Sequence, residues 1–101
     1  MNDAEIIKVL GEYPDKTADA LEKWKRATLE RKRVGSKLYL ELKAKAAGGE
    51  KTTVKELEMM VESNDEHYKM CLEEIMAESD YQKCYEKLMS AKKMASIRAA
   101  F

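Results

Sequence analysis

A pair of adjacent glycines near the middle of the chain constrains the fold more than any other feature. Gly48 and Gly49 follow a segment rich in Ala and Lys. Glycine ends helices because it adopts the left-handed backbone conformation without steric cost. Thr53 and Glu56 then have the spacing of a capping box, in which each side chain hydrogen-bonds a free N–H at the start of the next helix. Two long helices joined by a short turn pack antiparallel, so we expect a helical hairpin that turns over residues 48–52.

The composition indicates an all-α fold. Charged residues make up 38% of the 101 positions, and there are only four glycines and one proline. Abundant Ala, Glu, Lys, Leu and Met favour helices. A chain of about 100 residues forms one domain with a thin core, which we place at residues 1–101. Because two helices leave one flank of each uncovered, we expect a homo-oligomer.

The N-terminal residues predict a short helix before the first long one. Asp3 can cap a helix over residues 3–11, and Gly11 can end it. Tyr13 and Pro14 then break the chain, because proline disfavours helix at the residue before it.

The first long helix is expected over residues 15–47, with Asp15 or Thr17 as its cap. Gly35 indicates either close approach of another helix or a kink. Arg31 interrupts the face that we predict to be buried. That face repeats every three, four or seven residues and consists of Leu21, Trp24, Thr28, Gly35, Leu38, Leu42 and Ala46.

A second long helix is expected over residues 53–97. Its apolar phase slips near Ser79 and Asp80, where the helix bends, restarts or, as we expect, continues with a shifted face. Before the slip, the predicted buried face consists of Leu57, Met60, Val61, Asn64, Tyr68, Cys71, Leu72 and Ile75. After it, the face consists of Tyr81, Tyr85, Leu88, Lys92 and Ala95.

Charge is divided along the chain although the net charge is zero. Residues 15–51 contain eleven basic and six acidic side chains, residues 52–80 two and nine, and residues 81–101 five and one. An antiparallel coiled coil could pair its basic helix with its acidic one and so fix the register. Alternatively, the basic helix binds a negatively charged partner.

No set of residues has the spacing of a catalytic or metal site. His67 is the only histidine, and Cys71 shares a helix face with it. A Cys–His nucleophile also needs an orienting acid, a pocket and oxyanion donors, which the sequence does not supply. Cys71 and Cys84 lie about 20 Å apart along a helix and cannot form a disulfide, so we interpret both as small core residues. We predict a non-enzymatic protein without cofactor or metal.

The sequence also indicates where in the cell the protein resides. With no signal peptide and no run of about 18 apolar residues, we expect a cytoplasmic protein that does not bind membranes.

The methionines either fill a core or form an adaptable groove for a partner helix. Trp24 is either a core anchor or a stacking platform for single-stranded nucleic acid.

The arrangement of segments resembles the small phage recombination-mediator proteins of the UvsY type. The matching stretches are Gly48-Gly49-Glu50-Lys51 and Ile97-Arg98-Ala99-Ala100-Phe101, although this chain is shorter and has fewer aromatic residues around the turn. The resemblance implies a helical, self-assembling protein that binds single-stranded DNA and helps to load a recombinase onto DNA covered by single-strand-binding protein. It implies phosphate contacts by Lys25, Arg26, Arg31, Lys32, Arg33, Lys37, Lys92, Lys93 and Arg98.

Two functional hypotheses follow. In the first, the chain is a phage protein that oligomerises and binds single-stranded DNA in recombination. In the alternative, it is a structural or adaptor protein of phage assembly that binds other proteins and no nucleic acid. Its basic and acidic side chains then form ion pairs with one another, inside the hairpin or between subunits.

Overall fold

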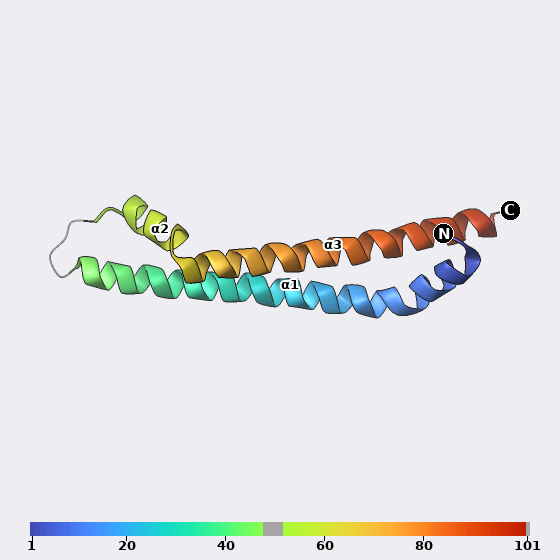
Figure 1. Ribbon diagram of the computed structural model, residues 1–101, viewed down its shortest axis with the longest axis horizontal. Helices are drawn as coiled ribbons and strands as arrows, with labels where there is room; N and C mark the ends of the chain where they lie inside the picture. Colours follow the sequence, from blue (N-terminus) through green and yellow to red (C-terminus); the bar gives the residue numbers. More distant parts are fainter. Residues whose placement is uncertain (48–51, 101) are drawn as a thin grey trace. The chain divides into compact units, whose positions relative to one another are not determined.

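The computed structural model describes residues 1–47 and 52–100, and all regular structure in these segments is helical (Figure 1). The helices are α1 (Asp3–Ala46), α2 (Val54–Glu62) and α3 (Asp65–Ala99). The all-α prediction is therefore confirmed. The predicted turn at Gly48 and Gly49 lies outside the described residues. No helix within the described segments is long and apolar enough to cross a membrane.

Helix α1 is continuous, so the predicted break at Tyr13-Pro14 is wrong. The helix runs for 44 residues and includes Pro14. A proline inside a helix removes one hydrogen bond and costs about 3 kcal/mol, which burial of side chains on both sides of it can offset. The predicted cap is also wrong by one residue, because the Oδ1 of Asn2 accepts from the N–H of Glu5 at 2.8 Å. Thr17, considered as a second cap, is a buried residue within α1.

The second predicted helix is divided in two, at a position that the sequence analysis did not identify. Thr53 Oγ1 accepts from the N–H of Glu56 at 3.1 Å, which confirms that Thr53 caps α2. Asn64 caps α3, because its Oδ1 accepts from the N–H groups of Glu66 and His67 at 2.9 and 3.1 Å. The helix therefore restarts at Asn64, and α3 passes without a break through residues 79–80, where we expected continuity over a bend or restart.

The chain forms two compact units, and α1 and α3 contribute to both. Unit 1 consists of Met1–Lys25 with Met76–Phe101, and unit 2 of Arg26–Ile75. The buried residues of unit 1 are Ile6, Val9, Thr17, Leu88 and Ala91. Those of unit 2 are Val34, Leu57 and Val61. Each unit therefore has a small core.

The predicted face of α1 is correct, whereas that of α3 is correct only in part. All seven predicted α1 residues are half-buried, and the buried Val9, Thr17 and Val34 of the same helix were not predicted as part of a buried face. On α3, by contrast, Tyr68, Leu72 and Ile75 are 59%, 43% and 60% exposed. The covered face of α3 instead repeats every seven residues, the spacing of a coiled-coil seam. It includes His67 and Glu74, which were not predicted, and Tyr81, Leu88 and Ala95, which were.

Candidate functional site

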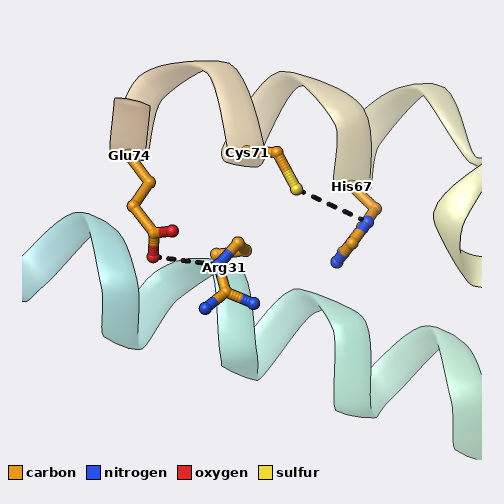
Figure 2. Close-up of polar contacts among 4 residues, drawn as sticks. All are labelled: Arg31, His67, Cys71 and Glu74. Carbon is orange, nitrogen blue, oxygen red and sulfur yellow. Dashed lines mark hydrogen bonds and ion pairs between the residues drawn. The ribbon is translucent and has the colours of Figure 1, made fainter. Parts of the chain in front are cut away.

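An ion pair joins α1 to α3 inside unit 2 (Figure 2). The Nε of Arg31 donates to the Oε2 of Glu74 at 2.9 Å, and the two side chains are 29% and 20% exposed. This hydrogen bond lowers the pKa of the Glu74 carboxyl, and Thr28 and Lys32 act in the same direction. Arg31, which interrupts the apolar face of α1 in the sequence, thus meets a carboxylate on the seam of α3.

One turn further along α1, the helices approach closely at Gly35. A Cβ at this position would lie 3.2 Å from the Nε2 of His67 and 3.9 Å from the Cγ1 of Val61. The absence of a side chain therefore lets the imidazole sit against the α1 backbone, which explains the glycine by close approach. The Nδ1 of His67 also lies 3.8 Å from the Sγ of Cys71 (Figure 2). His67 is half-buried.

Beside this close approach lies a groove of about 510 Å³ within unit 2. Its apolar lining includes Tyr39, Leu40 and Val61. Glu58 and Glu62, which are exposed and one helical turn apart on α2, line it as well. The described lining contains no lysine or arginine and is completed by Gly35, Ser36 and His67. We call this site the acidic groove.

The arginines predicted to bind phosphate have partners in the protein. Arg31 is paired as above, and Arg33 donates to Glu30 at 2.6 and 3.1 Å, which raises the pKa of Arg33 and lowers that of Glu30. Arg98 forms an ion pair with Asp3 in unit 1 and donates to the backbone oxygen of Met1 at 2.6 Å. These contacts reduce the charge available to a partner.

The five predicted lysines are exposed, and they are divided between the units. They are Lys25, Lys92 and Lys93 in unit 1 and Lys32 and Lys37 in unit 2. Arg26, the remaining predicted residue, is also exposed and belongs to unit 2.

Aromatic contacts in unit 1 involve residues that the sequence analysis treated separately. The ring of Trp24 stacks on that of Tyr81, with centroids 5.5 Å apart, and Tyr81 is followed by Tyr85 at 6.0 Å. Trp24 is therefore a packing residue between α1 and α3. The Nζ atoms of Lys16 and Lys87 also lie 4.9 and 5.0 Å from the centroid of the Tyr13 ring, a cluster that the analysis missed because it joins distant parts of the sequence.

Much apolar surface is exposed. In the described segments, thirteen large apolar side chains are exposed, whereas seven apolar residues are buried. Among the described residues, no large side chain is fully buried. Unit 2 contributes the exposed apolar residues Leu29, Leu40, Val54, Met59, Met60, Tyr68, Leu72 and Ile75.

No group of three or more His, Cys, Asp or Glu residues within the described segments could hold a metal ion. No protein-family model, curated protein or solved structure matches the chain. We therefore infer its function from the contacts, exposure and charge described above.

Proposed function

We propose that this chain is a non-enzymatic helical protein that self-associates and acts as a structural or adaptor module. The exposed apolar surface carries the proposal. In unit 2, eight large apolar side chains are exposed and only Val34, Leu57 and Val61 are buried. A stable interface buries about 800 Å² of each partner. A second copy that covers such side chains would enlarge the small core of each unit.

We also propose that α1 and α3 pair as an antiparallel hairpin. Contacts inside each unit support this, because residue numbers rise along α1 as they fall along α3. In unit 2, Arg31 pairs with Glu74 and Gly35 approaches His67. In unit 1, Asp3 pairs with Arg98 and Trp24 stacks on Tyr81. The helix restart at Asn64 makes α2 a separate arm of this hairpin.

The ion pairs of the arginines favour an adaptor over a nucleic-acid-binding protein. A guanidinium that already binds a carboxylate must exchange one anion for another when it meets a phosphate. We propose a reducing, cytoplasmic location as well, since the thiols of Cys71 and Cys84 are both free.

Self-association can be tested with the variant Leu72→Gln/Ile75→Gln. Both side chains are exposed, so the change leaves the contacts inside unit 2 intact. If these side chains are covered by another copy, the substitution places amides in an apolar interface, and we expect at least about tenfold weaker association. Sedimentation velocity measures the association, and circular dichroism shows whether the helices persist.

A matched control is Lys69→Gln/Glu73→Gln, which changes exposed polar residues on the same turns of α3 and keeps the net charge. We expect it to associate as the wild type does. Equal association of all three proteins would show that this face of α3 is not the contact.

Single-stranded DNA binding in recombination is the second candidate, and the exposed lysines favour it. Lys25 and Lys32 lie seven residues apart in α1 and so project from one side of the helix. In an oligomer, such lysines could follow a phosphate backbone, and binding would fall steeply with salt. A recombinase or single-strand-binding protein would then be a further partner.

Fluorescence anisotropy with an oligonucleotide of about 30 nucleotides tests this candidate. DNA binding predicts that affinity falls with salt and that Lys25→Gln/Lys32→Gln weakens it. Absence of binding at low salt would exclude the candidate and leave the adaptor function in place.

A further inference from the structure

The acidic groove of unit 2 has the chemistry to bind a helix that is both basic and apolar. Tyr39, Leu40 and Val61 offer apolar contact, and Glu58 and Glu62 offer two carboxylates one turn apart. Helices bind such grooves by placing an apolar side chain inside and their cations against the acidic rim. The exposed Met59 and Met60 on the same helix, α2, add side chains that adapt to a partner.

The chain itself contains a segment that fits this description. At the end of α3, Ile97 is 44% exposed, and Lys93 lies one turn before it on the same side of the helix. Lys92 is exposed beside Lys93. The end of α3 thus offers an apolar side chain with one ammonium group on its own side and a second on the neighbouring side, to a groove that has two carboxylates.

We infer that the acidic groove binds the C-terminal end of α3 from a second copy of the chain. We assign the occupant to a second copy, and Ile97 and the groove belong to different units of the chain. Charge complementarity supports a copy of this chain as the partner, since residues 52–80 have nine acidic and two basic side chains and residues 81–101 have one and five. The inference rests on the proposed self-association and names its contact.

Such a contact joins two different surfaces, so it is heterologous. Each copy would offer one groove and one basic helix end. Heterologous contacts close into rings when the rotation allows it and otherwise extend as filaments. The assembly is therefore expected to grow beyond a dimer as concentration rises.

Two charge-reversal variants of the full chain test the contact. Glu58→Lys/Glu62→Lys makes the groove basic, and Lys92→Glu/Lys93→Glu makes the helix end acidic. Each variant alone brings like charges together, so we expect self-association at 50 mM salt to weaken at least about tenfold. Because these side chains are exposed, circular dichroism should show unchanged helix content.

Mixing the two variants gives the decisive result. The Glu58→Lys/Glu62→Lys variant keeps its basic helix end, which can bind the unchanged acidic groove of the Lys92→Glu/Lys93→Glu variant. The acidic helix end of the latter can in turn bind the basic groove of the former. We expect the mixture to recover most of the wild-type association. The control Asp19→Lys/Glu86→Lys changes net charge as much as the groove variant does, at exposed positions outside the groove. It should associate normally.

The outcomes separate this inference from the proposed function. If the wild type associates but the reversed variants associate equally well, or their mixture shows no recovery, the groove contact is wrong and self-association stands. If a wild type that remains helical is monomeric throughout, both proposals fail.

Discussion

The two glycines of α1 lie in very different surroundings. A Cβ at Gly11 would have no atom within 4 Å, whereas a Cβ at Gly35 would press on the ring of His67 at 3.2 Å. Alanine favours an α-helix over glycine by about 1 kcal/mol wherever its methyl group fits.

We therefore predict that Gly11→Ala raises the free energy of unfolding by about 0.5–1 kcal/mol. Gly35→Ala should give no such gain, because the new methyl group displaces the imidazole. Chemical denaturation followed by circular dichroism measures both.

The double variant Gly35→Ala/His67→Ala tests whether the His67 ring is what opposes a methyl group at position 35. When it is compared with His67→Ala alone, alanine at position 35 should stabilise the protein, because the ring that opposed it is gone. If Gly35→Ala by itself stabilises as much as Gly11→Ala, the close approach of His67 to α1 is incorrect.

At the scale of helices, the Arg31–Glu74 pair shows why one buried face could be predicted and the other only in part. The apolar positions of α1 share one face, so their spacing identified it. The covered face of α3 includes His67 and Glu74, which are accommodated because Gly35 and Arg31 lie opposite them. Periodicity of apolar residues instead selected Tyr68, Leu72 and Ile75, which are exposed.

The same reasoning explains what was missed at the candidate site. The resemblance implied that Arg31 contacts phosphate, and the sequence did not reveal its partner Glu74, which is 43 positions away. The acidic groove combines side chains of all three helices, and α2 was not recognised as a separate helix. The signal for that separation was present, since Asn64 followed by two acidic residues is a typical helix start.

The ion pair predicts a pH dependence. Arg31 lowers the pKa of Glu74 from its usual value of 4.5. Because the pKa of Glu74 is lower in the folded state, the ion pair contributes its full stabilisation at any pH above the pKa of the unfolded state. This contribution is lost as pH falls below about 4.5 and through the lower folded value. Glu74→Gln should therefore reduce the free energy of unfolding by about 1 kcal/mol at pH 7.

Between pH 6 and pH 3, Glu74→Gln should also lose less stability than the wild type does. The control is Glu30→Gln, which removes the partner of Arg33 within one helix, at an exposed position where solvent screens the charges. It should have the smaller effect at pH 7. Parallel pH profiles for wild type and Glu74→Gln would contradict the ion pair between α1 and α3.

At the scale of the whole molecule, a single copy exposes more large apolar side chains than it buries. Seven apolar residues of the described segments are buried, whereas thirteen large apolar side chains are exposed. Exposed apolar side chains that adjoin one another, such as Met59 with Met60 and Leu72 with Ile75 one turn along α3, favour contact with a partner. A second copy that covers part of this surface would make each unit more stable, and stability would then depend on concentration.

Sedimentation equilibrium of the wild-type chain tests this directly. Over a range of about 2–200 µM, self-association predicts an average mass that exceeds the 11.6 kDa of one chain and increases with concentration. A mass of 11.6 kDa at every concentration, in a sample that circular dichroism shows to be helical, would contradict the proposed function.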